Sequence, residues 1–292
     1  MSYVMIYQTV YFLKWKFYIN LIIFSSTEAQ TTAFLKKWME MAAKYPEDTD
    51  SARCGYYTDR LVEKIYGICL ADLMKSEKEQ SNRFVVERID HIRSRVEASA
   101  DPVYAALQYA VLGNYLDFVA LKDKVSFSQM EEMLDKARDI QLDKTVVAQF
   151  LEDLEKGKSL LILTDNAGEI GFDRVFAQTL KKQYPHLEIT FCVRGEPVAN
   201  DATREDAAAV GIEFPVIDSG NAVGGTAEEL LSPQAKTALQ TADVILAKGV
   251  GNTESLFGCG YNVYYAFLAK CERVVEFFNV PMMQAVFIRD RK

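Results

Sequence analysis

The sequence is poor in the residues that build soft-metal sites and serine-type triads. Its 292 residues include only two histidines, His91 and His186, and five cysteines with no Cys-x-x-Cys pair. The odd cysteine count argues against a disulfide framework, and the spacing argues against a cysteine-based zinc site. We therefore expect free thiols in a cytoplasmic protein, with neither a histidine-rich metal site nor a Ser-His-Asp triad.

Blocks of basic residues are also missing. The chain has 33 Lys and Arg against 41 Asp and Glu, which gives a net charge of −8. Proteins that bind nucleic acid usually carry a basic face, so we expect no nucleic-acid partner. The acidic balance does not exclude phosphate ligands, because a metal ion and one or two local cations can hold them.

A long uninterrupted apolar run is lacking as well. Residues 3–24 are rich in aromatic and apolar side chains, but Gln8, Lys14, Lys16 and Asn20 interrupt them. A membrane-spanning helix needs about 20 mostly apolar residues, and a secretory signal carries its positive charges before its apolar region. We therefore expect no membrane anchor, and we expect residues 1–30 to be a packed N-terminal segment or an extension from an early start codon.

The rest of the chain divides into two parts by its apolar pattern. Residues 31–156 are predicted to form a helical domain, because apolar residues recur at helical spacing in 84–96, 127–140 and 146–154. In residues 157–292 the pattern alternates between short apolar runs and amphipathic segments. Strands are predicted at 160–163, 188–193, 212–217, 244–247, 264–269 and 285–288, and helices at 170–183, 203–210, 227–241 and 272–278. This alternation predicts an α/β domain with a mostly parallel, three-layer sheet.

Polar residues gather where three of these strands end. The apolar run of LLILTDNAGEIGFD (160–173) ends in Asp165-Asn166, the next strand is followed by Arg194 and by Asn200-Asp201, and a later strand by KGVGN (248–252). Ligands of open α/β sheets bind at the carboxyl ends of the strands. Carboxylate and amide oxygens suit a hard divalent cation, whereas basic side chains and glycine-exposed amides suit a phosphate.

Each of these clusters has an ordinary structural explanation when taken alone. Asn200-Asp201 before a helix is typical of an N-cap, and Lys248-Gly249 is typical of a turn. The Gly249–Gly251 pair lacks the third glycine of a dinucleotide fingerprint, and no Walker A spacing is present. What the ordinary explanations leave open is why metal-type and phosphate-type groups collect at the same edge.

Several blocks resemble those of a known family. DNAGE at 165–169, RGEPVANDAT at 194–203 and KGVGNTESL at 248–256 are similar to signature blocks of the metal-dependent damage-control phosphatases. DP at 101–102 and GNYLDF at 113–118 resemble blocks of the family's helical domain, and Lys270-Cys271 resembles a block near its C-terminus. The likeness covers about residues 100–290 and is to the stand-alone prokaryotic branch. The first 30 residues do not match, and the N-terminal CxxC of some relatives is absent.

The resemblance implies a fold and a set of site residues. A helical domain would pack over the catalytic edge of the sheet domain. Asp165, Asn166 and Asp201 would hold the catalytic divalent metal, Mg²⁺ or Mn²⁺, with Co²⁺ or Ni²⁺ as alternatives. The substrate, a small-molecule phosphate ester, would be bound by these residues: Lys248, Asn114, Asp117, Arg194 and Asn252.

The expected activity is therefore hydrolysis of small phosphometabolites, such as sugar phosphates or damaged phosphorylated metabolites. A divalent cation would neutralise charge on the phosphoryl oxygens, and fixed donors would add to this effect. Two routes stay open, attack by a metal-activated water and a transient aspartyl-phosphate on Asp165. The alternative functions are an S-adenosylmethionine-dependent carboxyl methyltransferase, which the family was once described as containing, and a non-catalytic phosphometabolite-binding protein.

Overall fold

The computed structural model describes residues 27–46, 49–116, 131–132, 134–135 and 137–290. The apolar stretch of residues 3–24, the predicted site residue Asp117 and part of the predicted helix at 127–140 lie outside these ranges. Within them, no helix has the length and apolar content needed to cross a membrane.

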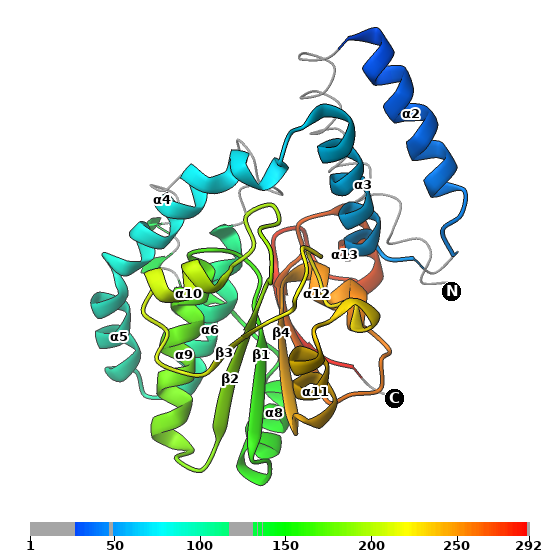
Figure 1. The fold of residues 1–292 in the computed structure, drawn as a ribbon. Coiled ribbons are helices and arrows are strands. Elements are labelled where there is room, and N and C mark those ends of the chain that lie inside the picture. The colour runs from blue at the N-terminus through cyan, green and yellow to red at the C-terminus, as the bar shows by residue number, and fades with distance from the viewer. Residues whose placement is uncertain (1–26, 47–48, 117–130, 133, 136, 291–292) are drawn as a thin grey trace.

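A six-stranded sheet forms the centre of the molecule (Figure 1). Its strands run in the order β3-β2-β1-β4-β5-β6, and all neighbours pair in parallel except β6, which is antiparallel to β5. The mostly parallel sheet predicted from the sequence is thus confirmed. The strands are β1 (Ser159–Leu163), β2 (Glu188–Val193), β3 (Val216–Asp218), β4 (Val244–Lys248), β5 (Val263–Leu268) and β6 (Ala285–Arg289).

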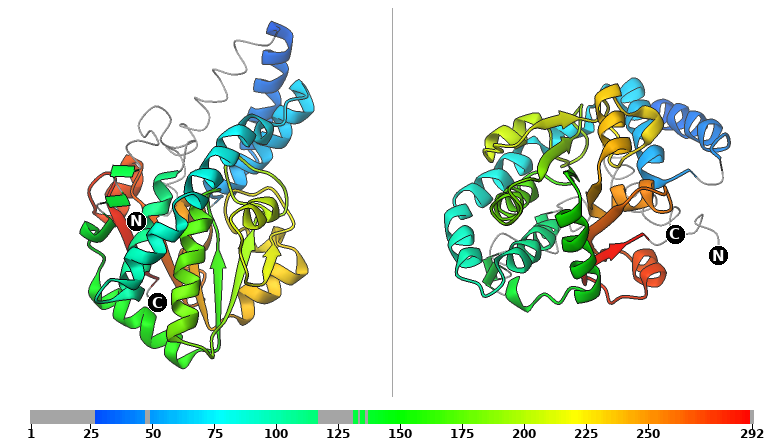
Figure 2. Two further views of the ribbon diagram at one scale, coloured as in Figure 1. Left: turned by 90° about the vertical axis from the view of Figure 1, so that its left-hand side faces the viewer. Right: turned by 90° about the horizontal axis from the view of Figure 1, so that it is seen from below.

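Helices cover both faces of the sheet, which gives three layers (Figure 2). Leu160 and Ile162 of β1 point into one core and Leu161 and Leu163 into the other, because successive strand residues face opposite sides. The first core is closed by α6 (Pro102–Leu112), α8 (Lys144–Lys156) and α9 (Glu169–Gln183). The second is closed by α11 (Pro233–Thr241), α12 (Gly249–Leu256) and α13 (Glu272–Phe278).

The N-terminal part of the chain is helical, as expected. Helices α2 (Glu28–Ala42) and α3 (Ser51–Tyr66) pack together and project from the sheet region (Figure 1). Further along, α4 (Lys75–Val86), α5 (Ile89–Glu97) and α6 pack against α9. The turn η2 (Gly113–Leu116) then brings Asn114 to the carboxyl edge of the sheet. The exact division of the chain at residue 156 remains a prediction.

Three predicted elements differ from the structure by more than a one-residue change at an end. The single helix predicted at 84–96 is wrong, since α4 ends at Val86 and α5 begins at Ile89, which allows both helices to contact α9. The strand predicted at 212–217 is shorter, because Pro215 has no amide to donate to a ladder and β3 begins after it. The helix predicted at 227–241 is also wrong, because Ser232 caps a new helix whose first residue is Pro233.

The strand order reverses between β1 and β4. Strand β1 continues outward to β2 on one side, and β4 continues to β5 on the other. In open α/β sheets a crevice forms outside the carboxyl ends of the strands at such a reversal, and ligands bind there. The segments that follow β1 and β4 therefore lie at the expected ligand position.

Candidate active site at the carboxyl edge of the sheet

Two segments that leave neighbouring strands pair with each other at this edge. Asn166 and Asp201 form an antiparallel bridge. The amide of Ala167 donates to Asn200 O at 2.8 Å, and the amide of Ala202 donates to Asp165 O at 2.7 Å. Asn166 and Asp201 are therefore a non-hydrogen-bonded pair, the type in which facing Cβ atoms lie about 4.5–5.5 Å apart.

Asp165 is held from three directions. Its Oδ2 accepts hydrogen bonds from Asn114 Nδ2 and from Asn166 Nδ2, each at 2.8 Å. On another side lies Gly249, where any Cβ atom would overlap the Asp165 carboxylate. Gly249 also has a φ of +78°, which L side chains rarely adopt. The first residue of α12 is therefore a glycine for two independent reasons, and both keep Asp165 in place.

Asp201 is held by Arg194. The guanidinium Nε donates to Asp201 Oδ2 at 2.7 Å, and its other nitrogens donate to Gly225 O at 2.7 Å and Asn252 Oδ1 at 3.2 Å. Asn252 in turn donates to the backbone oxygens of Thr164 at 3.0 Å and Lys248 at 2.7 Å. The structure thus brings Arg194 and Asn252 beside Asp201. The hydrogen-bond partners of both side chains are buried groups of the protein, so both side chains stabilise the loops around the site.

Lys248 lies beneath the edge. Its side chain is fully buried, and its ammonium donates to Asp173 Oδ1 at 2.6 Å and to Ala110 O at 2.8 Å. It also forms an ion pair with Glu169 Oε1 at 2.8 Å, so three protein oxygens surround the ammonium. In this arrangement Lys248 does not reach the open edge. Whether it contacts a substrate phosphate remains a prediction.

Glu169 links Lys248 to the predicted metal ligands. While its Oε1 pairs with Lys248, its Oε2 accepts from Asn114 Nδ2 at 3.0 Å and from Asn166 Nδ2 at 2.7 Å. The same two amide groups also donate to Asp165. Glu169 and Asp173 were not singled out from the sequence. Glu169 is the last residue of DNAGE and the first residue of α9, and Asp173 follows it by four positions. This i, i+4 spacing places both carboxylates on one helix face, and it was the signal in the sequence that could have identified them.

The site region carries an excess of negative charge. Four buried carboxylates (Asp165, Glu169, Asp173 and Asp201) stand against two buried cations (Arg194 and Lys248). Burial raises the pKa of Asp173 to about 7, although Lys248 acts in the opposite direction. Burial alone would lower the pKa of Lys248, but its two carboxylate partners raise it above the ordinary value. Such an excess favours binding of a cation.

The donor set fits a hard divalent ion. Asp165 and Asp201 offer carboxylate oxygens, and Asn166 offers an amide oxygen that accepts from Asn200 Nδ2 at 2.7 Å and has a second lone pair. In the described ranges no three His, Cys, Asp or Glu side chains gather as a metal site. That finding is compatible with this set, which has two carboxylates and one amide. The roles of these residues remain predictions.

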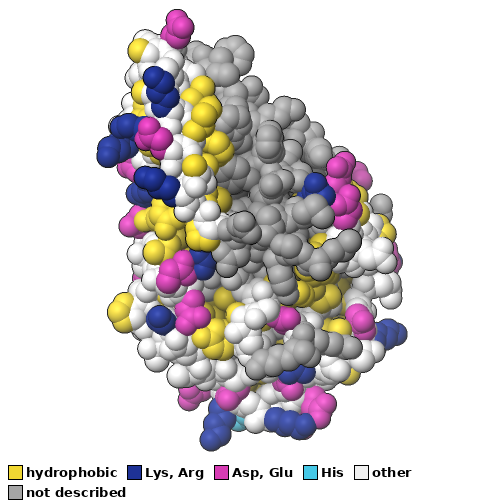
Figure 3. Space-filling view, turned by 90° about the vertical axis from the view of Figure 1, so that its right-hand side faces the viewer, with side chains coloured by type: hydrophobic (Ala, Val, Ile, Leu, Met, Phe, Trp, Pro, Cys, Tyr) yellow, Lys and Arg dark blue, Asp and Glu magenta, His cyan; other side chains and the backbone are white. Residues whose placement is uncertain are grey.

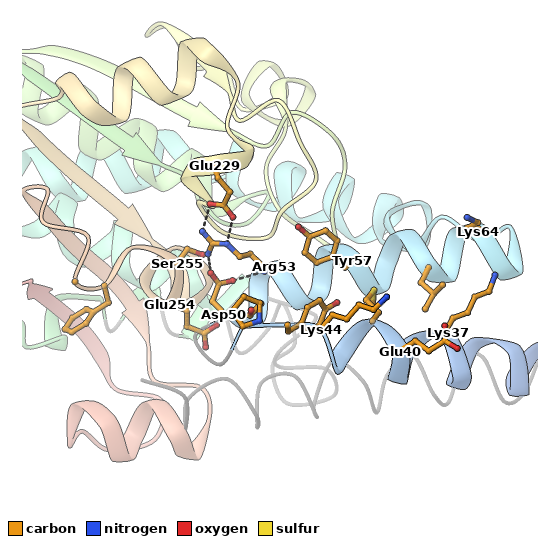
Figure 4. Close-up of a pocket in the computed structure, with 17 residues that line it drawn as sticks. Lys37, Glu40, Lys44, Asp50, Arg53, Tyr57, Lys64, Glu229, Glu254 and Ser255 are labelled. Atoms are coloured by element: carbon orange, nitrogen blue, oxygen red, sulfur yellow. Dashed lines mark hydrogen bonds and ion pairs between the residues drawn. The ribbon is translucent and has the colours of Figure 1, made fainter. Parts of the chain in front are cut away.

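A cavity lies away from this edge. It measures about 1060 Å³ and is bounded by α2, α3 and the C-terminal end of α12 (Figure 4). Among its lining residues Arg53 pairs with Asp50 and Glu229. None of the predicted site residues within the described ranges lines it. On the face of the molecule that includes α2, basic and acidic side chains are interspersed over the described surface (Figure 3). We place the site at the strand ends, where the buried polar groups converge.

The sheet order and the strand-end cluster define the class of the molecule. It is an α/β protein with a polar, negatively charged site at the point where the strand order reverses. The profile of the damage-control phosphatase ARMT1-like domain matches residues 16–286, and the chain belongs to this family. The resemblance inferred from the signature blocks is confirmed. The expectation that the first 30 residues fall outside it is wrong from residue 16 onward.

Three archaeal relatives match over long ranges. An uncharacterized protein of Methanocaldococcus jannaschii is 30% identical over 273 residues, which is 90% of this chain and 88% of that protein. A damage-control phosphatase of Archaeoglobus fulgidus is 28% identical over 246 residues, 82% of this chain and 83% of that one. A damage-control phosphatase of Pyrococcus horikoshii is 30% identical over 191 residues, 64% of each chain.

A solved structure has the same fold. The crystal structure of a DUF89 family protein from Pyrococcus horikoshii superposes with a TM-score of 0.75. The match covers 99% of this chain and 96% of that chain, at 23% identity. The likeness therefore extends over the helical part as well as the sheet.

The contact between Gly249 and Asp165 predicts a stability difference between two glycine variants. Gly249→Ala and Gly67→Ala both place a side chain at positive φ, +78° and +67°, at a cost of about 1–2 kcal/mol. Gly67 has open space around its added Cβ, whereas Gly249 does not. We expect the free energy of unfolding, measured in urea, to fall by about 1–3 kcal/mol more in Gly249→Ala than in Gly67→Ala, because the Asp165 side chain must move. Equal losses in the two variants would contradict this contact.

The buried Asp173 predicts a pH dependence of stability. Its pKa is raised from 3.8 to about 7 by burial, so between these values the folded protein keeps a proton that the unfolded chain releases. The contribution of this proton to the free energy of unfolding is fully present below about pH 4 and is lost as the pH rises through about 7. The melting temperature of Asp173→Asn should therefore depend less on pH between 5 and 8 than that of the wild type. The control is Asp90→Asn, at an exposed side chain, whose melting temperature should follow the pH dependence of the wild type. The same pH dependence in Asp173→Asn would contradict the raised pKa of Asp173.

Proposed function

We propose that this protein is a divalent-metal-dependent phosphatase that hydrolyses small phosphate monoesters. The observation that carries the proposal is the pairing of Asn166 with Asp201 beside Asp165 at the switch point of the sheet. The family membership and the two relatives named damage-control phosphatases support a phosphatase role. Their names also support damaged phosphometabolites as the substrate class, with sugar phosphates as the simplest members to test.

Asp165, Asn166 and Asp201 would hold the ion, Mg²⁺ or Mn²⁺. When bound, the cation would supply positive charge at the phosphoryl oxygens and lower the pKa of a coordinated water. The transition state of phosphoryl transfer spreads negative charge over these oxygens, so most of the rate enhancement comes from positioning and charge. The excess negative charge around the site favours uptake of the ion before substrate arrives.

The residues of the chain itself would position the reacting groups. Arg194 fixes the orientation of the Asp201 carboxylate, and Asn114 fixes that of Asp165. The backbone amides at the start of α12, next to Gly249, would serve as fixed donors for a phosphate. Lys248 would act from beneath the edge through Glu169, and direct contact with the phosphate would require it to leave its carboxylate partners.

Two carboxylate variants test the proposal. Purified protein should release inorganic phosphate from a panel of sugar phosphates only when Mg²⁺ or Mn²⁺ is added. Asp165→Ala and Asp201→Ala should lower kcat at least 1000-fold, because each removes a predicted ligand, while circular dichroism shows an intact fold. The control is Asp90→Ala, whose side chain is 89% exposed on α5, and it should retain wild-type activity.

Three outcomes would contradict the proposal. Full activity in both variants would refute the site assignment. Tight binding of S-adenosylmethionine in metal-free buffer would favour a methyltransferase. Binding of phosphate esters without turnover over the whole panel would indicate a non-catalytic binding protein.

A further inference from the structure

Asn82 is a buried side chain of α4 that no sequence motif singles out. It is 7% exposed and makes two hydrogen bonds to segments far away in the sequence. Its Oδ1 accepts from the amide of Gly168 at 2.7 Å, and its Nδ2 donates to Asp206 Oδ1 at 2.8 Å. One side chain thus connects the loop after β1 with the first turn of the helix that follows Asp201.

Gly168 belongs to the loop that carries Asp165 and Asn166. It precedes α9 and has a φ of +76°. Its amide is one of the helix N-terminal donors that have no partner within the helix. Asn82 supplies that partner. The bond therefore fixes the turn immediately after the two predicted metal ligands.

Asp206 belongs to the segment that carries Asp201. It lies in the first turn of α10 (Arg204–Ala209), where its Oδ2 accepts from the amide and from the hydroxyl of Thr203, each at 2.8 Å. Lys78 of α4 pairs with the same carboxylate at 2.7 Å. Thr203 is two residues from Asp201 and bridges to Arg194. The bond from Asn82 to Asp206 therefore fixes the segment after the third predicted ligand.

We propose that Asn82 is a positioning residue, which sets the separation between the Asp165-Asn166 turn and Asp201. The inference rests on the proposed function, because it assumes that these residues bind the metal. The carboxamide of Asn82 offers an acceptor oxygen and a donor nitrogen on one short side chain, and each is used by a different segment. The helix that carries Asn82 is itself fixed, since a Cβ atom at Gly171 of α9 would come within 2.6 Å of Val85 Cγ1. The turn at Gly168 and the segment that contains Asp206 are therefore both anchored to α4, a helix outside the sheet.

Mn²⁺ binding measures this role directly. The affinity of the purified full chain for Mn²⁺ alone, followed by electron paramagnetic resonance of the free ion, is compared in wild type, Asn82→Ala and Glu79→Ala. Glu79 is an exposed residue of the same helix and serves as the matched control. We expect Asn82→Ala to bind Mn²⁺ about 10–100-fold more weakly, the range usual for loss of outer-shell support. Glu79→Ala should bind as the wild type does.

Amide hydrogen exchange gives a second readout without metal. Exchange at the Gly168 amide should accelerate in Asn82→Ala, because its acceptor is lost. In Asn82→Asp the acceptor remains but a carboxylate faces Asp206, so Mn²⁺ affinity should fall while Gly168 stays better protected than in Asn82→Ala. Asn82→Asp also covers the case in which Asn82→Ala does not fold.

The outcomes separate the two proposals. Absence of Mn²⁺ binding by the wild type would refute the metal assignment and, with it, the basis of this inference. Binding by the wild type together with affinities within twofold in both folded Asn82 variants would refute the role of Asn82 alone. Unchanged exchange at Gly168 in Asn82→Ala would also refute it.

Discussion

The site depends on the pairing of residues 165–167 with residues 200–202. Strands β1 and β2 are parallel, with Leu163 opposite Cys192, so the segments that leave them begin side by side. The second segment then turns back and pairs in the antiparallel sense, which places Asp201 opposite Asn166. Two short hydrogen bonds close this pair. Without it, the carboxylates of Asp165 and Asp201 would belong to two independent loops, and no fixed set of oxygens would exist.

Electrostatics explains the groups around this pair. Lys248 and Arg194 each satisfy buried acceptors, which removes the large cost of leaving a carboxylate buried without a partner. The compensation is incomplete, because the buried carboxylates outnumber the cations. A divalent ion would offset this excess of negative charge. The same network orients the amides of Asn114 and Asn166 toward Asp165 and Glu169, so charge compensation and ligand geometry have a common origin.

Local signals in the sequence were sufficient for the sheet and for the motifs. The apolar run before Asp165 and the runs at 188–193 and 244–247 predicted three central strands, and topology then brought their ends together. The break between α4 and α5 was not predictable, because apolar spacing continues through it and only packing on α9 requires it. The burial of Lys248 and the role of Asn82 depend on contacts with distant residues, Ala110 in one case and Gly168 in the other. Periodicity and motif spacing carry no information about such contacts.

The most direct test is a crystal structure of the protein grown with Mn²⁺ and inorganic phosphate, with anomalous data collected near the manganese edge. We expect one strong anomalous peak within coordination distance of oxygens from Asp165, Asn166 and Asp201, with phosphate bound to the ion and facing the start of α12. A peak at another place, or side chains of these three residues that turn away from the bound ion, would contradict it.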